Sequence, residues 1–347
     1  MINLLDLTLE ELEELLAGWG EASFRAGQLF QWLHQHLATS FDQMTNLPKS
    51  LRQRLEENCT TGSLILKKRL VSAIDGTVKY LYGLSDGNAV EGVRMRYKHG
   101  NSLCISTQVG CRMGCGFCAS TLGGLVRNLT AGEMLGEVYA AARDLPEGEK
   151  IGSIVLMGIG EPLDNFDNVC KFLELLSHPK GFGLSLRHVS LSTCGLVDGI
   201  YKLAEKKYPL TLSISLHAPD DESRSALMPV NRKYNIETLL AACRDYFAKT
   251  GRRVSFEYTL IHQKTDQVHQ ARRLAALLKG MNCHVNLIPL NAVRERELSR
   301  STPRAVREFQ QELEKAGITV TVRRELGADV MAACGQLRRE SKESSST

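Results

Sequence analysis

Residues 102–118 read Ser-Leu-Cys-Ile-Ser-Thr-Gln-Val-Gly-Cys-Arg-Met-Gly-Cys-Gly-Phe-Cys, a strand-like stretch that runs into a loop with three cysteines. From here to the C-terminus, strand-like stretches alternate with amphipathic helix-like stretches. We expect strands at 102–108, 152–157, 187–193, 209–216, 253–260, 284–289 and 318–323. Between them we expect helices near 131–144, 165–177, 198–206, 235–249, 266–279 and 303–316. This repeat indicates an α/β protein whose parallel sheet carries helices on its outside and curves into a partial or full barrel.

The first hundred residues follow different patterns. Residues 8–58 carry apolar side chains at helical spacing and predict a small helical domain with Phe24, Phe30 and Trp32 in its core. Residues 63–108 alternate with period two around three pairs that favour turns, Asp75-Gly76, Asp86-Gly87 and Gly100-Asn101. We therefore expect a helical accessory domain at 1–60, an antiparallel β extension at 61–100, the barrel core at 101–337 and a disordered polar tail at 338–347.

The composition excludes several classes of protein. The chain has 347 residues, of which 43% are hydrophobic and 24% charged, so it is not a largely disordered chain, a collagen or a coiled coil. No apolar run approaches the ~18 residues of a membrane span, and the N-terminus lacks the basic region of a signal peptide. We therefore expect a cytoplasmic protein. The formal net charge of +4 permits nucleic-acid binding without indicating it, because many enzymes with small substrates have a similar charge.

Ten cysteines in a long chain without a secretion signal do not indicate a disulfide framework. Cys111, Cys115 and Cys118 have the spacing C-x3-C-x2-C, and thiolates in such close succession select zinc or an iron–sulfur cluster. Structural zinc sites take four ligands, usually from two C-x2-C pairs, and this chain has no second pair. Three cysteines that bind a four-iron cluster leave its fourth iron open to an outside molecule. The ordinary alternative is that these three are structural cysteines that lie close together by chance. We interpret five further cysteines as structural: Cys59, Cys170, Cys194, Cys243 and Cys283.

The loop resembles that of the radical S-adenosylmethionine (SAM) enzymes, in which an aromatic residue, here Phe117, precedes the third cysteine. The resemblance implies a partial (βα)6 radical-SAM barrel, one [4Fe-4S] cluster on the three cysteines, and an open iron that binds the amino and carboxylate groups of SAM. It also implies SAM binding by residues at the ends of the predicted strands: Gly160, Glu161, Ser192, Ser215, Leu216, His217 and Asn291. Ordinary alternatives exist, since Glu161 could cap the next helix and Ser192 or Asn291 could bind loop backbone groups.

Four longer motifs narrow the resemblance: residues 104–111, 157–163, 215–220 and 333–337. Together they resemble the RlmN/Cfr family of RNA adenine methyltransferases over essentially the full chain, including an RNA-binding role for the N-terminal helices. The resemblance implies two SAM molecules per turnover, one as methyl donor and one as radical source. It implies that Cys334 carries the methyl group as S-methylcysteine, that Cys104 resolves a protein–RNA adduct through a transient disulfide with Cys334, and that Glu91 is the proton acceptor. On residue type alone, Cys104 would be a buried strand cysteine and Glu91 a strand surface charge.

One branch of this family methylates carbon 2 of an adenosine in 23S rRNA, at the peptidyl-transferase centre, and of an adenosine in the anticodon loop of some tRNAs. The Cfr branch methylates carbon 8 and confers antibiotic resistance. Val109 and residues 119–124 resemble the carbon-2 branch. Two further alternatives are a radical enzyme of another class, such as a glycyl-radical activase, and an iron–sulfur RNA-binding module without catalysis.

The partners follow from the same resemblance. We expect 23S rRNA and tRNA as substrates, an electron donor such as flavodoxin or ferredoxin, no membrane partner, and a monomeric enzyme. Arg94, Arg96 and Lys98 share one face of a predicted strand and are candidates for contacts with RNA phosphates. A solvated strand face is the alternative for these three residues.

Overall fold

Parallel strands form the centre of the molecule in the computed structural model, which describes residues 1–98 and 100–338. They lie side by side in their order along the chain: β6 (Gly100–Ile105), β9 (Ile151–Leu156), β10 (Val189–Thr193), β11 (Thr211–Ser215), β12 (Val254–Leu260), β13 (Cys283–Pro289) and β14 (Thr319–Val322). Within the described residues β14 does not pair with β6, so the barrel is partial. The predicted α/β class and the partial (βα)6 barrel are confirmed.

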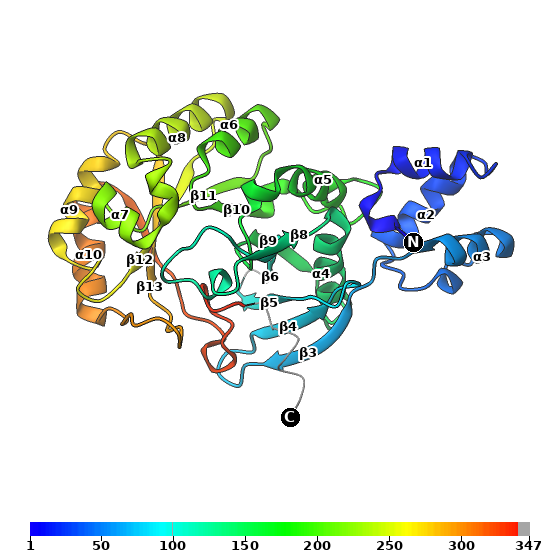
Figure 1. Ribbon diagram of the computed structural model, residues 1–347, viewed down its shortest axis with the longest axis horizontal. Helices are drawn as coiled ribbons and strands as arrows, with labels where there is room; N and C mark the ends of the chain where they lie inside the picture. Colours follow the sequence, from blue (N-terminus) through cyan, green and yellow to red (C-terminus); the bar gives the residue numbers. More distant parts are fainter. Residues whose placement is uncertain (99, 339–347) are drawn as a thin grey trace.

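Helices connect these strands and cover the outer face of the sheet (Figure 1). They are α4 (Ala131–Arg143), α5 (Phe166–Ser177), α6 (Val197–Lys206), α8 (Ile236–Thr250), α9 (Val268–Leu277) and α10 (Pro303–Lys315). Two of these helices begin with signals that are visible in the sequence: Thr130 and Glu133 form a capping box at α4, and α10 begins at Pro303. A further short helix, α7 (Asp221–Leu227), lies against the cysteine loop, where the Gly116 N–H donates to the Leu227 carbonyl oxygen at 2.8 Å. The helix α7 was not among the predicted helices; Asp220 caps it by accepting from the Ser223 N–H at 2.8 Å.

The antiparallel extension belongs to the same ten-stranded sheet as the barrel in the described part of the chain. Its strands are β3 (Ile65–Val71), β4 (Val78–Gly83) and β5 (Ala89–Tyr97), and β5 pairs antiparallel with β6. The predicted turn at Gly100-Asn101 is wrong, because both residues pair with β5 as the first residues of β6. The extension therefore continues directly into the first barrel strand.

The N-terminal helices lie at one end of the molecule, next to α4 and away from the far barrel strands (Figure 1). They are α1 (Leu9–Ala17), α2 (Phe24–His34) and α3 (Lys49–Asn58), and β1 (Ile2–Asn3) pairs with β2 (Cys59–Thr60). His34 Nδ1 and the Tyr139 hydroxyl, 2.7 Å apart, join α2 to α4. The predicted aromatic core is correct for the fully buried Phe30 and wrong for Phe24, which is 59% exposed.

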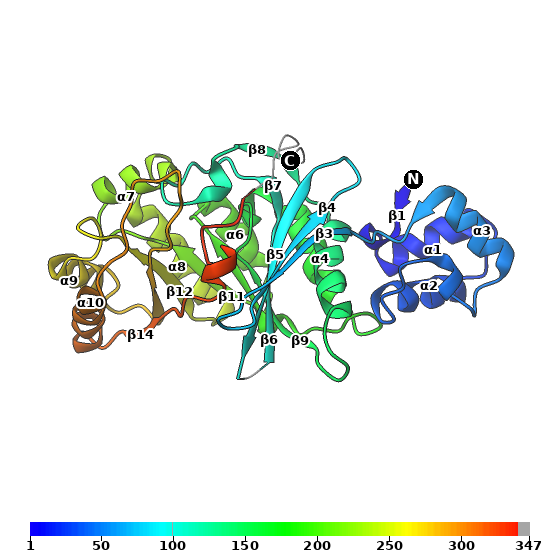
Figure 2. The ribbon, with the colours of Figure 1, turned by 90° about the horizontal axis from the view of Figure 1, so that it is seen from below.

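The C-terminal segment returns from β14 to the β extension and lies beside β5 (Figure 2). The Gly327 N–H donates to Asp75 Oδ2 and the Ala73 N–H donates to Asp329 Oδ2, both at 2.9 Å. Apart from Arg338, the predicted tail at 338–347 lies outside the described residues. No helix within the described ranges is long and apolar enough to cross a bilayer.

Candidate active site

A short hairpin carries the three clustered cysteines. Its strands are β7 (Gln108–Gly110) and β8 (Leu125–Asn128), and the predicted strand 102–108 ends earlier, at Ile105. Gly110 has a φ of +77°, and a side chain there would place its Cβ 1.9 Å from the Gly124 carbonyl oxygen. Only glycine therefore allows the two strands to approach each other at the base of the cysteine loop.

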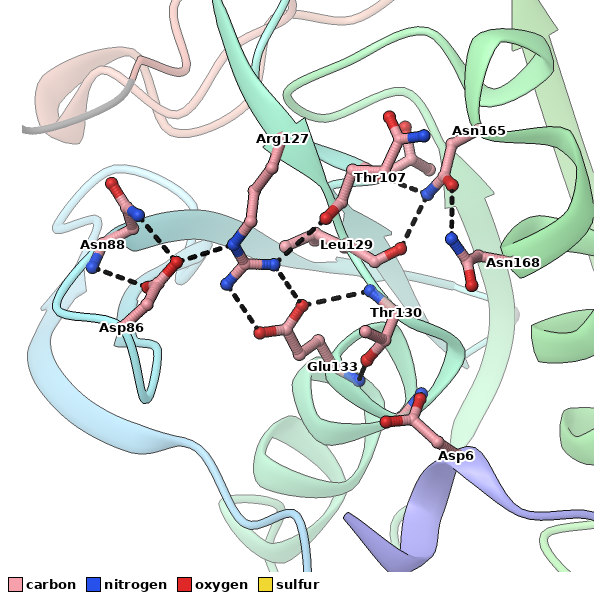
Figure 3. Close-up of polar contacts among 12 residues, drawn as sticks. Asp6, Asp86, Asn88, Thr107, Arg127, Leu129, Thr130, Glu133, Asn165 and Asn168 are labelled. Carbon is pink, nitrogen blue, oxygen red and sulfur yellow. Dashed lines mark hydrogen bonds and ion pairs between the residues drawn. The ribbon is translucent and has the colours of Figure 1, made fainter. Parts of the chain in front are cut away.

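Arg127 ties the base of this hairpin to two neighbouring elements (Figure 3). Its Nε donates to Asp86 in the β4–β5 turn at 2.6 Å, and its Nη1 and Nη2 donate to the Glu133 carboxylate on α4 at 2.7 and 2.8 Å. The guanidinium holds the pKa of Asp86 well below its usual range. Asn165 donates to backbone carbonyls at both ends of the hairpin, each at 2.8 Å. Contacts distant in sequence thus hold the cysteine loop in place.

Cys111, Cys115 and Cys118 line one cavity of about 930 Å³, which includes its open mouth. Burial raises the pKa of Cys111 to about 12 and raises the pKa of Cys115 and Cys118, so all three are thiols unless a metal group binds them. In the part of the chain that the structure describes, no three His, Cys, Asp or Glu side chains gather closely enough to hold a single metal ion. The three loop thiols all line the wall of this cavity. Three cysteines in one loop, without a second C-x2-C pair, fit an iron–sulfur cluster better than a four-ligand structural zinc ion.

Polar groups at the ends of four barrel strands line the same cavity: Gly160, Glu161, Ser192, Ser215, His217 and Asn291. They come together because parallel strands place their carboxyl ends at one edge of the sheet. Leu216 is the exception among the residues expected to bind SAM. Its side chain is fully buried in the main hydrophobic core, and its N–H donates to the Glu257 carbonyl at 3.1 Å. The structure therefore leaves Leu216 no side-chain contact with a ligand in this cavity.

Glu161 uses its carboxylate to cap backbone groups. Its Oε1 accepts from the Leu163 N–H at 3.0 Å and its Oε2 from the Cys194 N–H at 2.7 Å. Burial raises the pKa of this carboxyl group. The capping alternative is thus confirmed for the side chain, and a ligand at this position would meet the neighbouring backbone.

His217 adopts a strained backbone conformation at the end of β11, with a φ of +58°. Its Nδ1 accepts from the Thr259 N–H at 3.0 Å, and burial lowers its pKa to about 3. The ring is therefore neutral at physiological pH and carries its proton on Nε2. It packs edge-on against Phe117, with the ring centroids 4.7 Å apart, and so joins the cysteine loop to β11.

A second cavity of about 750 Å³ adjoins the first and contains the other two cysteines expected to react. Cys104 lines it from β6, and Cys334 lines it from the C-terminal segment. Cys334 also lines the first cavity, so this residue stands at the boundary between the two. Burial, and secondarily the nearby Cys334, raises the pKa of Cys104 well above the usual value for a thiol.

Glu91 lies in a smaller cavity beside the second one. Its Oε1 pairs with Lys79 Nζ at 2.6 Å, and its Oε2 accepts from the Arg338 N–H at 2.9 Å. The surface-charge alternative for Glu91 is wrong, because the residue is 3% exposed. Of the expected pair Cys104 and Glu91, only Cys104 reaches the cavity at the barrel mouth.

Arg323, which was not among the predicted site residues, lines both cavities. Its Nη1 donates to Cys334 Sγ at 2.8 Å, and its Nη2 pairs with Glu257 at 3.2 Å. Arg323 follows β14 directly, so the strand-end argument that selected Ser192 would have selected it as well. The signal was present in the sequence, because the last predicted strand ends at residue 323.

Two of the three candidates for phosphate contacts project away from the site. Val93 and alternate residues after it line the second cavity, so Arg94 and Arg96 project from the opposite face of β5. Arg94 is buried and donates to the Tyr80 hydroxyl at 3.2 Å, and Arg96 pairs with Glu149 at 3.1 Å. The phosphate interpretation is wrong for the buried Arg94.

Comparisons with known proteins cover the whole chain. The model of the ribosomal RNA large subunit methyltransferase N-terminal domain matches residues 2–61, and that of the radical SAM superfamily matches residues 105–275. The probable dual-specificity RNA methyltransferase RlmN of Alkaliphilus oremlandii is 53% identical over 98% of both chains. The protein of the same name from Clostridium perfringens is 52% identical over 98% of this chain and 97% of its own.

A solved structure extends the comparison to three dimensions. The crystal structure of a radical SAM methyltransferase from Sphaerobacter thermophilus matches with a TM-score of 0.94 and 44% identity. It covers 97% of this chain, and this chain covers 99% of it. Since the similarity extends from the N-terminal helices through the β extension to the segment that carries Cys334, the chain belongs to the RlmN family of radical SAM RNA methyltransferases.

Proposed function

We propose that this protein methylates carbon 2 of one adenosine in 23S rRNA, at the peptidyl-transferase centre, and of an adenosine in the anticodon loop of some tRNAs. The name that the relatives carry, dual-specificity RNA methyltransferase, supports two kinds of RNA substrate. Val109 and residues 119–124 support the carbon-2 branch of the family. The position of Cys334 between the two cavities supports a mechanism in which this residue carries the methyl group from SAM to the adenine.

One observation carries the proposal: Cys334 lines both cavities, whereas Cys104 lines only the second. A methyl group that moves from a donor to an aromatic carbon through a protein carrier needs a residue that reaches both partners. The position of Cys334 on both cavities supports a role in which it accepts the methyl group on the side of the cysteine loop and presents it to an adenine on the other side. Cys104, which lines the second cavity, would attack Cys334 after the transfer.

The chemistry of carbon 2 of adenine explains why the methyl group would be transferred through Cys334. Carbon 2 of adenine is an electron-poor aromatic carbon and cannot attack the methyl group of SAM as a nucleophile. Cys111, Cys115 and Cys118 would hold a [4Fe-4S] cluster, whose chemistry would be to supply the electron that cleaves SAM to a 5′-deoxyadenosyl radical. The methyl group on Cys334 would lose a hydrogen atom to this radical, and its carbon would add to the adenine ring.

Cys104 and Glu91 are the residues proposed to release the methylated adenine from Cys334. The adenine adduct would first lose its ring proton and one electron, which the bound cluster would take back. The Cys104 thiolate would then attack Cys334 Sγ, and the carbon–sulfur bond would break with its electron pair on the carbon. That carbon would take a proton to become the methyl group, and a disulfide would join the two cysteines. Glu91 is the proposed proton acceptor. Its carboxylate binds Lys79 and the Arg338 N–H and lines a cavity other than that of Cys104, so Glu91 must come into contact with the adenine before it takes a proton from the ring.

The first cavity would hold SAM in both of its roles, as methyl donor and as radical source, so that each turnover uses two molecules. The proposed contacts are Gly160, Glu161, Ser192, Ser215, His217 and Asn291, with Leu216 contributing only backbone atoms. His217 offers its Nε2 proton, and Glu161 offers the backbone beside its buried side chain.

The partners belong to the same proposal. A protein that modifies ribosomal and transfer RNA would work in the cytoplasm, and we propose that it does so as a monomer. The electron would come from a small donor protein such as flavodoxin or ferredoxin. The N-terminal helices, which match the N-terminal domain model of a ribosomal RNA methyltransferase, would bind RNA.

The test is anaerobic reaction of the reconstituted protein with SAM, reductant and either 23S rRNA or tRNA, followed by mass spectrometry of the released adenosines. We expect 2-methyladenosine from both RNAs. Formation of 8-methyladenosine would assign the protein to the Cfr-type alternative. Release of 5′-deoxyadenosine without any methylated RNA would favour another radical SAM class, and no 5′-deoxyadenosine at all would favour a binding module.

A further inference from the structure

A buried ion pair lies against the segment that carries Cys334. Lys79 Nζ on β4 and Glu91 Oε1 on β5 are 2.6 Å apart, and their side chains are only 9% and 5% exposed. Removing two charges from water is costly, and their attraction offsets this cost only when their other hydrogen-bonding groups are also satisfied. Lys79 and Glu91 each make one such further hydrogen bond, and both bonds go to the backbone of the segment that carries Cys334.

Each partner of the pair holds one end of this segment. Lys79 Nζ donates to the Met331 carbonyl oxygen at 3.2 Å, and Glu91 Oε2 accepts from the Arg338 N–H at 2.9 Å. Residues 331–338 therefore form a loop whose two ends are joined through one ion pair, with Cys334 near its middle. We call these residues the Cys334 loop; it lies beside β5 in Figure 2.

The middle of the Cys334 loop is held from the other side. Asn291 Nδ2 donates to the Cys334 carbonyl oxygen at 3.0 Å. The N–H of Ala119, the residue after Cys118, donates to the Gly335 carbonyl oxygen at 2.8 Å. The loop is thus held between the barrel mouth and the β extension. Losing the ion pair would remove one contact from each end of the loop and so loosen these ends, while its middle stayed attached to the barrel. The C-terminal end keeps two other contacts, since Ser120 Oγ donates to the Leu337 carbonyl oxygen at 2.8 Å and Arg338 pairs with Glu295 at 2.6 Å.

We propose that Lys79 is a positioning residue for the methylation of Cys334, acting through Glu91 and the ends of the Cys334 loop. The inference rests on the proposed function of Cys334 as the methyl carrier. In this step the bond between the sulfonium sulfur of SAM and its methyl carbon breaks, and that carbon bonds to Cys334 Sγ. S-adenosylhomocysteine leaves with the electron pair, and the thiol proton passes to solvent.

Such a transfer is sensitive to the position of the accepting sulfur, because a misplacement of about 1 Å can cost up to ~100-fold in rate. The proposal also gives Glu91 a task that precedes RNA binding, in addition to its proposed role as proton acceptor. If Glu91 acted only as a proton acceptor, Lys79 would affect the reaction only after adenine had been attacked. The methylation of Cys334 in the absence of RNA therefore separates the two roles.

The experiment compares Lys79→Met with the wild-type protein and with Lys68→Met as a matched control. Lys68 lines the same small cavity from β3, and no hydrogen bond or ion pair joins it to the Cys334 loop within the described residues. Each reconstituted protein is incubated with SAM and reductant without RNA. The S-methylcysteine content of the Cys334 peptide, the 5′-deoxyadenosine released and the iron content are measured over time. Hydrogen exchange of residues 331–338 is measured on the protein before SAM is added.

For Lys79→Met we expect Cys334 methylation, and the 5′-deoxyadenosine release that depends on it, to slow at least about tenfold while iron content stays within about twofold of wild type. Hydrogen exchange in the Cys334 loop should accelerate in Lys79→Met and not in Lys68→Met. Lys79→Arg, which keeps the cation, should restore most of the methylation rate. A general loss of structure would instead lower the iron content as well.

Wild-type methylation together with unchanged exchange in Lys79→Met would overturn the proposal. If Lys79→Met does not fold, because it leaves the Glu91 charge buried without its partner, the double variant Lys79→Met/Glu91→Gln removes both charges, and the same expectations apply to it. A wild-type protein that never forms S-methylcysteine would overturn the proposed function itself. In that case hydrogen exchange alone decides whether the ion pair holds the loop.

Discussion

Replacing Cys104 by alanine separates the structural role of this residue from its proposed chemical role. The side chain is buried with Val93, Ala332 and Leu337, so the loss of its sulfur should cost about 1 kcal/mol of unfolding free energy. A protein stable by about 5–15 kcal/mol stays folded after such a loss. The variant should therefore load its cluster and cleave SAM. The reaction of the variant should then stop at the covalent protein–RNA conjugate, because no thiol is present to attack the Cys334 sulfur.

The rate at which the protein–RNA conjugate decays should depend on pH, because Cys104 attacks as a thiolate. Burial raises the pKa of Cys104 well above neutrality, so the attacking thiolate is a small fraction of the thiol at pH 7. That fraction grows about tenfold with each pH unit until the raised pKa is reached. The transient conjugate of the wild-type protein should accordingly decay about tenfold faster per pH unit between about pH 7 and about pH 9. The conjugate of Cys104→Ala should persist across this range.

The assay is a denaturing gel after anaerobic turnover, with nuclease digestion and mass spectrometry of the Cys334 peptide. Conjugate decay is followed after a jump in pH. Cys243→Ala is the matched control, because Cys243 is fully buried on α8 in the main core and lines neither the first nor the second cavity. It should lose similar stability and form no lasting conjugate. Free methylated RNA at wild-type yield from Cys104→Ala would refute the reasoning and return Cys104 to a packing role.

Replacing any one of the three loop cysteines by alanine should abolish iron binding and SAM cleavage, measured by iron analysis and 5′-deoxyadenosine release; full iron content in such a variant would contradict the cluster assignment. Cys334→Ala should keep the cluster and transfer no methyl group, and its peptide should lack the added CH2 mass found in the wild type. Arg127→Met should lower the unfolding free energy by about 2 kcal/mol, because its two ion pairs are only partly exposed, whereas Arg304→Met on the surface should leave urea unfolding unchanged. Burial lowers the pKa of His34 to about 3, so below pH ~6.5 protons bind the unfolded chain more readily than the folded one; stability should fall by up to about 1.4 kcal/mol per pH unit as the pH drops toward 3, and His34→Gln should lack this contribution in urea titrations at pH 7 and 5.

Much of the architecture could be predicted from local pattern. The alternation of strand-like and helix-like stretches after residue 102 predicted each parallel strand and most of the helices, because a buried parallel strand needs an apolar run and an outer helix needs an amphipathic one. Capping signals such as Thr130 and Pro303 placed helix ends correctly. The short helix α7 and the hairpin β7–β8 were missed, because they are too short to carry a period of their own.

The residues on which the proposed chemistry depends could also be identified from the sequence alone, because the spacing of Cys111, Cys115 and Cys118 and the presence of Cys104 and Cys334 are properties of the chain itself. The tertiary structure decided which of these groups share a space. It placed Cys334 at the boundary of two cavities, directed Arg94 away from them, and assigned the Glu161 carboxylate to backbone capping.

The same holds for the charges around Cys334. Lys79, Glu91 and Arg323 lie far from Cys334 in sequence or on unrelated elements, and nothing in their local sequence shows that they meet at the Cys334 loop. Their meeting depends on how a long C-terminal segment folds back onto the first strands of the sheet. Local periodicity reports which face of an element is apolar, whereas contacts between distant segments depend on the closure of the whole fold.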